Sequence, residues 1–183
     1  MPDFTTIEYL KSGNERQQKA YQLLSKYRFF EKLKAYSPIL AGTIPIEIDI
    51  EGSDLDIISE VDLSFEEGFL DELMLSKCIP GNTDVQVNYP MIDGEKCIVL
   101  SFILEDLPIE IFGQNKPTIQ QKAYLHMIAE YRILKEKGED FKQKINKNTE
   151  KYTKRKICII YNECNLTNIQ QSYNLKPNIQ LQS

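Results

Sequence analysis

The sequence lacks the features that would favour a membrane, a secretion route or a nucleic-acid duplex. No apolar run approaches the roughly 20 residues that cross a bilayer. The first ten residues, MPDFTTIEYL, contain no basic stretch followed by an apolar run, so we expect no secretion signal and a cytoplasmic location. The formal net charge of −5 provides no basic field to hold a duplex by its phosphates. Nucleic acid is therefore not a favoured partner, whereas a small nucleotide that brings its own cation is compatible with this charge.

Cysteine and histidine are too few and too scattered for a disulfide framework or a structural zinc site. The four cysteines are Cys78, Cys97, Cys158 and Cys164, with no Cys-x-x-Cys pair among them. We expect free thiols in a reducing compartment. The one histidine, His126, lies four residues before Glu130, and we interpret it mainly as a packed or hydrogen-bonded side chain.

The chain is long enough for one domain with a sizeable core and a short appendage. Its 183 residues have ordinary apolar and charged content for a globular protein. Beyond about residue 140 the sequence becomes polar and rich in Lys, Asn and Gln, without a helical stripe of useful length. We expect an α+β domain over residues 1–140 and a weakly ordered polar tail over 141–183.

Apolar residues at helical spacing predict three helices. The first covers residues 15–36, where apolar residues recur at intervals of three and four and Ser12 and Glu15 have capping-box spacing; Pro38 ends it. The second covers about residues 65–76. The third covers residues 117–137, with Pro117 in its first turn and Gly138 at its end.

The remaining segments have the patterns of β-strands. Residues 39–41 are a short apolar strand, and residues 46–50 alternate isoleucine with acidic residues as a half-buried strand does. Further strands are predicted over residues 54–60, 84–89, 97–104 and 107–112. Asp93-Gly94 predicts a hairpin, and residues 106–108 a second tight connection.

Asp54-Leu55-Asp56 is the stretch with the clearest chemical meaning. On an extended segment the two carboxylates point to the same face, with Cα atoms roughly 7 Å apart, while Leu55 points to the other face. Gly42-Thr43 comes 12 positions before Asp54, directly after an apolar strand. Such a turn can expose backbone N–H groups to a phosphate. An acidic pair and a phosphate cradle together indicate a site for a metal-bound nucleoside triphosphate, although each motif alone also occurs in ordinary turns.

Glu110 is the third carboxylate of interest, because it lies between Ile109 and Ile111 in the segment LPIEIFG. A lone carboxylate in an apolar strand is unfavourable to bury without a partner. Either this strand is an edge strand with Glu110 facing water, or it lies beside residues 54–60. In the second case Glu110 completes a cluster of three carboxylates.

These motifs resemble the nucleotidyltransferase fold of the DNA polymerase beta superfamily. The resemblance consists of a helix, a strand with a Gly-hydroxyl turn at Gly42-Thr43, the Ser53-Asp54-Leu55-Asp56 strand, and a third acid in a later strand. More closely, GTIPIEIDIEGSDLDI, LPIEIFGQ and QQKAYLHMIAEYRIL look like an uncharacterised bacterial family, a domain of unknown function, over about residues 15–140. Thr43 and Glu110 differ from the Ser and Asp usual in the superfamily. The strand-like IPIEIDI replaces the usual helix after the turn.

The resemblance implies a nucleotidyltransferase dependent on Mg²⁺ or Mn²⁺, which moves a nucleotidyl group from an NTP to a hydroxyl acceptor. Gly42, Thr43 and Ser53 would bind the nucleotide phosphates. Asp54, Asp56 and Glu110 would be catalytic metal ligands, with Glu110 also assisting deprotonation of the acceptor. Apart from the resemblance, Lys122 and Arg132 of the predicted helix 117–137 are either further contacts for the triphosphate or part of a solvated helix face.

Two other interpretations stay open at this point. One is a non-catalytic nucleotide-binding or protein-binding module on the same fold, for example one component of a toxin–antitoxin pair. The other is a purely structural domain with an acidic edge, which would bind no nucleotide in a metal-dependent way.

Overall fold

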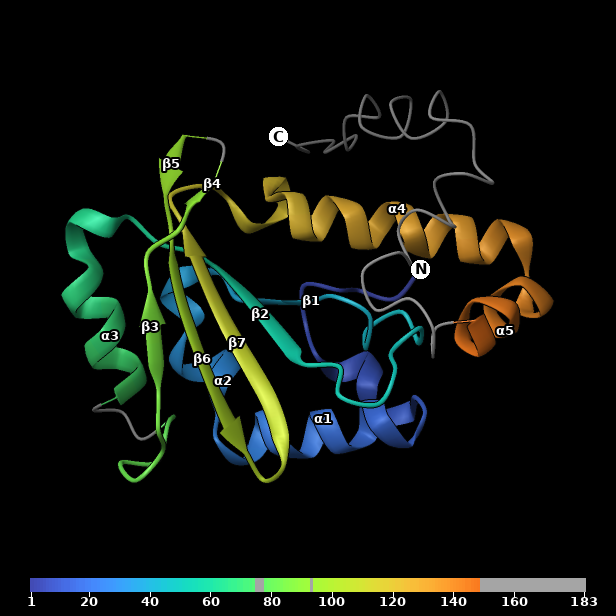
Figure 1. Cartoon of the computed structure of the whole chain (residues 1–183), viewed down its shortest axis with the longest axis horizontal. Helices are drawn as coiled ribbons and strands as arrows, with labels where there is room; N and C mark the ends of the chain where they lie inside the picture. Colours follow the sequence, from blue (N-terminus) through green and yellow to red (C-terminus); the bar gives the residue numbers. More distant parts are fainter. Residues whose placement is uncertain (75–77, 93, 149–183) are drawn as a thin grey trace, which may run out of the picture. The chain divides into compact units, whose positions relative to one another are not determined.

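The computed structural model describes residues 1–74, 78–92 and 94–148 (Figure 1). The chain forms two compact units, residues 1–127 and 128–183. The first unit holds the whole β-sheet and every candidate site residue except Arg132. The described part of the second unit is helical. In the described part of the chain, no helix is both long enough and apolar enough to cross a bilayer.

Eight helical segments of the described residues begin in the first unit. They are 3₁₀ helix η1 (Glu8–Ser12), α1 (Glu15–Lys26), α2 (Phe29–Lys32), 3₁₀ helix η2 (Lys34–Tyr36), η3 (Leu63–Phe65) with α3 (Glu66–Met74), η4 (Thr118–Gln120), and α4 (Lys122–Lys137), which continues into the second unit. Helix α5 (Glu139–Asn148) follows Gly138, whose φ of +80° ends α4 where the sequence predicts.

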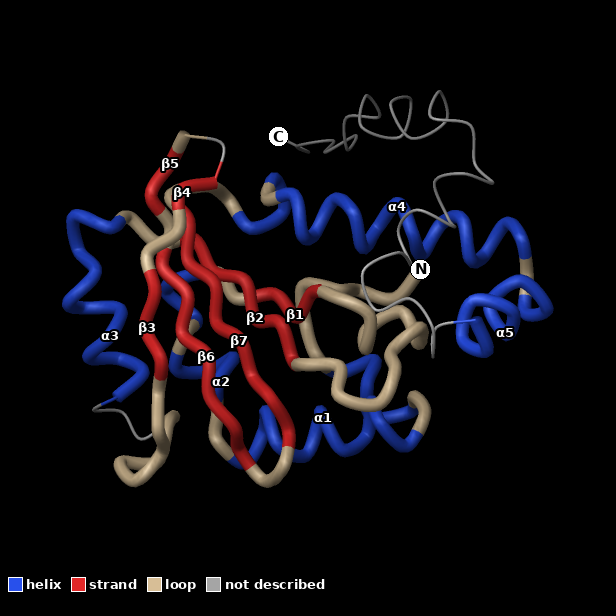
Figure 2. The backbone as a smooth tube through the Cα atoms, in the orientation of Figure 1, coloured by secondary structure: helices blue, strands red, loops and turns tan. Residues whose placement is uncertain are grey.

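A five-stranded mixed sheet forms the centre of the first unit (Figure 2). Its strands are β1 (Ile39–Ala41), β2 (Leu55–Glu60), β7 (Leu107–Gln114), β6 (Ile98–Leu104) and β3 (Gln86–Asn88), in that spatial order. β2 and β7 run parallel, and the other neighbours are antiparallel. β4 (Met91–Ile92) and β5 (Glu95–Lys96) form a separate antiparallel pair, and Asp93 of the predicted hairpin turn lies outside the described residues. These pairings confirm the predicted α+β class.

The two faces of the sheet differ in chemistry. One face carries apolar residues such as Ile57 and Ile111, both fully buried, which share a core cluster with Leu24 of α1, Phe29 of α2 and Phe69 of α3. Side chains alternate between faces along a strand. The opposite face therefore receives the intervening positions, and these are the positions that carry the carboxylates.

The helix predicted over residues 15–36 is interrupted in the structure. Arg28 has a left-handed φ of +58° between α1 and α2, which is incompatible with a continuous α-helix. The predicted capping box is displaced as well: the cap is Asn14, whose side chain accepts from the Gln17 N–H while the Gln17 side chain accepts from the Asn14 N–H. The predicted stripe still faces the core, since Ala20, Leu23 and Leu24 are buried.

The strand predicted over residues 46–50 is wrong. Residues 44–47 form turns, with a left-handed φ of +61° at Glu47, and residues 48–50 have no regular secondary structure. Ile44, Ile46 and Ile48 are all buried nonetheless. The isoleucines Ile44, Ile46 and Ile48 are thus buried from a looped backbone rather than from a strand, because this segment pairs with no neighbouring strand among the described residues.

Gln17 holds this loop against α1. Its buried side-chain amide donates to the carbonyls of Ile44 (3.0 Å) and Pro45 (3.1 Å). Removing the amide would leave these buried carbonyls without that donor.

We therefore expect Gln17→Ala to lower the free energy of unfolding by about 2–3 kcal/mol. Urea denaturation measures the change. Gln18→Ala is the matched control, because exposed Gln18 also donates to a backbone carbonyl (Gly13, 2.8 Å) and should change stability by less than about 1 kcal/mol. Equal losses in the two variants would contradict a supporting role for Gln17.

The remaining predictions are met in part. Helix 117–137 begins as the 3₁₀ turn η4 before α4, and in the helix predicted near 65–76 Phe65 is 73% exposed rather than part of the core. Helix α5 covers the first residues of the predicted tail. Residues 149–183 of that tail, with Cys158 and Cys164, lie outside the described residues. Cys78 and Cys97 are both buried.

Candidate active site

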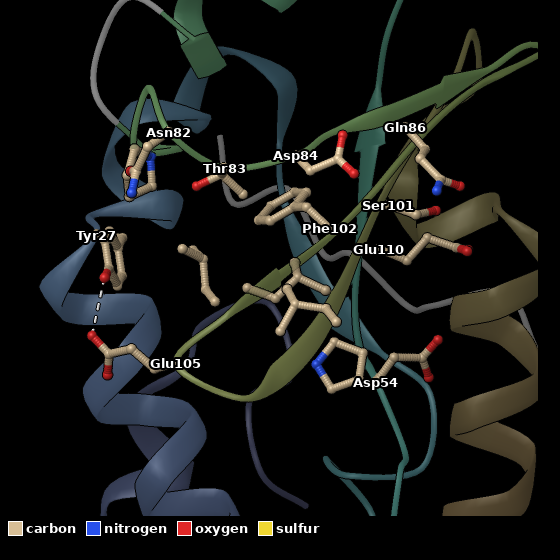
Figure 3. A pocket seen from close by; sticks show the side chains of 15 residues that line it. Tyr27, Asp54, Asn82, Thr83, Asp84, Gln86, Ser101, Phe102, Glu105 and Glu110 are labelled. Atoms are coloured by element: carbon tan, nitrogen blue, oxygen red, sulfur yellow. Dashed lines mark hydrogen bonds between the residues drawn. The ribbon is translucent and has the colours of Figure 1, made fainter.

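A polar row crosses the sheet at one register position. Asp56 of β2 is paired with Glu110 of β7, Glu110 with Ser101 of β6, and Ser101 with Gln86 of β3. Residues directly opposite one another in a sheet point to the same face. Figure 3 shows the side chains of Glu110, Ser101 and Gln86 directed to the same side, one beside the next. The sheet therefore brings the predicted carboxylates of β2 and β7 together and extends the row by two hydrogen-bonding groups.

Asp54 lies one residue before β2 and is exposed. It lines the same cavity as Glu110 and acts electrostatically on both Glu110 and Asp56. Burial, together with the negative charges of Asp54 and Glu110, raises the pKa of Asp56 to about 8. Burial and Asp54 also raise the pKa of Glu110. The three carboxylates thus share one region of negative potential.

Gly42 makes the closest approach to this region. Its φ is +81°, and a Cβ built on its backbone would lie 2.2 Å from Oδ2 of Asp56. Glycine is favoured there, both because of the left-handed backbone and because the carboxylate occupies the space of a side chain. The glycine turn predicted from the sequence is therefore adjacent to the Asp-x-Asp strand, since Ala41 of β1 pairs with Asp56.

Thr43 and Ser53 meet beside this turn, with their hydroxyl oxygens 3.4 Å apart. The Ser53 hydroxyl accepts from the Ile50 N–H at 2.9 Å, so it also closes its own loop. Arg16 of α1 donates from its guanidinium to the Ser53 carbonyl at 2.7 Å. Sequence reasoning missed Arg16, because nothing in its local pattern indicates a partner 37 residues away. Lys122 and Arg132, the cations predicted instead, are exposed, and Arg132 belongs to the second unit.

The carboxylates fit a magnesium ion better than a metal held by protein ligands alone. Within residues 1–74, 78–92 and 94–148, no group of three or more His, Cys, Asp or Glu side chains is arranged to hold a metal. Mg²⁺, however, is commonly bound through one or two carboxylates together with water and substrate phosphates. Asp56 and Glu110 are paired across β2 and β7, and Asp54 is near enough to raise the pKa of both. An oxygen-only donor set with uncompensated negative charge suits such a hard cation.

Ser101, Gln86 and Asp84 were missed by sequence reasoning. Ser101 is a polar residue inside the apolar strand β6, as Glu110 is in β7, and Gln86 alternates with valines. The two-residue turn at Glu105 and Asp106, both with positive φ, fixes the pairing of Ser101 with Glu110. That signal was available in the sequence. The pairing of β3 with β6 could not be predicted from the sequence, because the β4–β5 pair between these two strands leaves their register undetermined.

A cavity of about 760 Å³ opens beside the row. Figure 3 shows Asn82, Thr83 and Asp84 at one side of it, Tyr27 and Glu105 at another, and Asp54 and Glu110 near its other end. All of its lining residues belong to the first unit.

Comparison with solved structures identifies the fold. A chain of the GLD-2/RNP-8 complex matches 97% of this chain and 74% of its own length, with a TM-score of 0.58 and 12% identity. The polymerase core of TRAMP, an RNA surveillance complex, matches 76% of this chain at a TM-score of 0.47 and 13% identity. The Cid1 poly(U) polymerase with Mg and 3′-dATP bound matches 68% of this chain at a TM-score of 0.44 and 15% identity. This chain spans 42% of the TRAMP chain and 37% of the Cid1 chain. No curated protein matches the sequence.

The likeness with a TM-score of 0.58 defines the fold class. The fold is nucleotidyltransferase-like, built as a small mixed sheet with flanking helices. The chain itself belongs to the family described as Domain of unknown function (DUF4269), whose model matches residues 22–156. This family agrees with the resemblance found in the sequence to a domain of unknown function.

Proposed function

We propose that the protein is a Mg²⁺-dependent nucleotidyltransferase that moves a nucleotidyl group from an NTP to a hydroxyl acceptor. One observation carries the proposal: Asp56 and Glu110 are paired across parallel strands, and the glycine turn at Gly42 lies against the Asp56 carboxylate. An ionisable pair beside a glycine turn is a combination that suits a metal-bound triphosphate.

The turn at Gly42 and Thr43 would bind the β- and γ-phosphates. A backbone without a side chain can approach a phosphate closely, and the Thr43 hydroxyl adds a hydrogen-bond donor. Ser53 would support this turn through Thr43, since their hydroxyl oxygens are 3.4 Å apart. Arg16 would position Ser53, and with it the start of the Asp-x-Asp segment, through its hydrogen bond to the Ser53 carbonyl.

The acids would serve the transfer itself. Asp54, Asp56 and Glu110 would hold the magnesium ion, which supplies positive charge against the triphosphate. Glu110 would accept the proton of the acceptor hydroxyl, a role that suits its raised pKa. The acceptor oxygen then forms a bond to the α-phosphorus, the bond from that phosphorus to the bridging oxygen breaks, and pyrophosphate leaves with the electron pair.

Isothermal titration of ATP, GTP, CTP and UTP, each with and without Mg²⁺, tests the binding step. We expect at least one NTP to bind at least tenfold more tightly with Mg²⁺, and Asp54→Asn to remove that dependence. Pyrophosphate release in the presence of an acceptor then tests turnover. Binding of all four nucleotides without any dependence on Mg²⁺, or none at all, would contradict the proposal. Metal-dependent binding without turnover on any acceptor would instead support a non-catalytic module.

A further inference from the structure

We infer that the cavity beside the polar row binds the acceptor, and that this acceptor is a small molecule bearing both hydroxyl and ammonium groups rather than a nucleic acid. The inference rests on the proposed function, because it assigns the second substrate of the same site. It adds Asp84, Gln86 and Ser101 as residues that determine acceptor specificity.

Several segments of the first unit line the cavity. The loop leading to β3 contributes Thr83 and Asp84, and strands β6 and β7 contribute Ser101 and Glu110. Asp54 lines the same cavity. A molecule held there can therefore present a hydroxyl to the carboxylates without leaving the cavity.

The size of the cavity suits a small molecule. Its volume of about 760 Å³ lies within the roughly 300–1,000 Å³ that is usual for small-ligand sites. A disaccharide or a compound of similar size fits in this volume.

The polar row provides the groups that hydroxyls need. Ser101 and Gln86 each offer a donor and an acceptor, and their register with Glu110 sets them in line across three strands. At the other side of the cavity, the Tyr27 hydroxyl is fixed by a 3.0 Å hydrogen bond to Glu105 (Figure 3). Several hydroxyls of one molecule can thus be hydrogen-bonded at once.

The charge of the lining decides against a nucleic acid. Asp54, Asp84, Glu105 and Glu110 line the cavity, and the described residues that line it include neither lysine nor arginine. Lys26 neutralises Glu105 through a salt bridge. Asp84 has no basic partner among the described residues and lies on the loop before β3, apart from the proposed metal ligands. Its carboxylate would attract an ammonium group and repel a phosphate backbone.

A matched pair of sugars tests this inference on the full chain by isothermal titration. The β-1,4-linked glucosamine dimer and cellobiose differ only in two amines that replace hydroxyls. With Mg²⁺ and a non-hydrolysable NTP present, we expect the glucosamine dimer to bind at least tenfold more tightly than cellobiose. Asp84→Asn should reduce this preference to less than threefold. Asp71→Asn, an exposed aspartate on α3, is the control and should keep it.

Three outcomes would overturn the inference: equal binding of the two sugars, binding of neither, or tighter binding of a short RNA oligonucleotide. The NTP titration is read separately in the same samples. Mg²⁺-dependent NTP binding combined with one of these outcomes would reject the acceptor assignment alone. Absence of NTP binding would reject the proposed function itself.

Discussion

Replacing Asp56 by asparagine is expected to reduce nucleotidyl transfer by at least about 10³-fold while leaving the protein folded. Asparagine keeps the shape of the side chain but removes its negative charge. Within the proposed site this removes a metal ligand that sits at the centre of the three acids, opposite Glu110 and against Gly42. The loss is measured as pyrophosphate release at saturating NTP.

The same substitution should stabilise the protein at alkaline pH. The pKa of Asp56 is raised from 3.8 to about 8 in the folded state, so the unfolded state releases this proton at lower pH. The free energy of unfolding of the wild type therefore falls as the pH rises from about 4 to about 8. The asparagine side chain cannot ionise, so the variant avoids this loss. Because the site is only partly buried, we expect the free energy of unfolding of the variant to exceed that of the wild type by about 2 kcal/mol at pH 8. No gain is expected at pH 4.

The control for both effects is Asp71→Asn, which removes a carboxylate from the exposed surface of α3. It should leave transfer unchanged and should not alter the pH dependence of unfolding. Full turnover in Asp56→Asn would refute the proposed mechanism. A loss of turnover accompanied by a lower free energy of unfolding at pH 8 would show that the carboxylate supports the fold instead.

The core of the candidate site was predictable from sequence because strand periodicity fixes faces. Asp54 and Asp56 flank a residue that must be buried, and Glu110 interrupts an apolar strand, so each acid had to face away from the core. Because β2 pairs with β7, acids that face the same way on these two strands also lie close together. Gly42 was found from its residue type and its place after a strand, and its close approach to Asp56 supplies the physical reason for glycine.

The parts that were missed depend on long-range contacts. The apolar spacing of residues 15–36 continues past Arg28, so periodicity alone cannot reveal the break between α1 and α2. The turns over residues 44–47 depend partly on hydrogen bonds from Gln17 to the carbonyls of Ile44 and Pro45, which are 27 and 28 residues away. Local pattern describes which side chains are buried, but not which backbone conformation buries them.

Gly42→Ala is expected to reduce transfer by at least about 100-fold, because a methyl group would displace the Asp56 carboxylate. The built Cβ lies 2.2 Å from Oδ2 of Asp56 but 3.2 Å from its Cγ, so rotation of the carboxylate can relieve the clash. The displacement should therefore affect activity more than stability. The clash with Asp56 and the strain of the left-handed φ of +81° together should lower the free energy of unfolding by about 2–3 kcal/mol.

Gly52→Ala separates backbone strain from the clash with Asp56. Gly52 has the same φ of +81°, but a Cβ there would meet no atom within 4 Å. The free energy of unfolding of Gly52→Ala should be lower than that of the wild type by only about 1–2 kcal/mol, which is the contribution of the left-handed backbone. Combining Gly42→Ala with Asp56→Ala should reduce the cost of the glycine substitution to that same value, since the carboxylate is gone. If Gly42→Ala costs no more than Gly52→Ala and retains transfer, the turn does not define the position of Asp56, and the phosphate-binding role assigned to Gly42 fails.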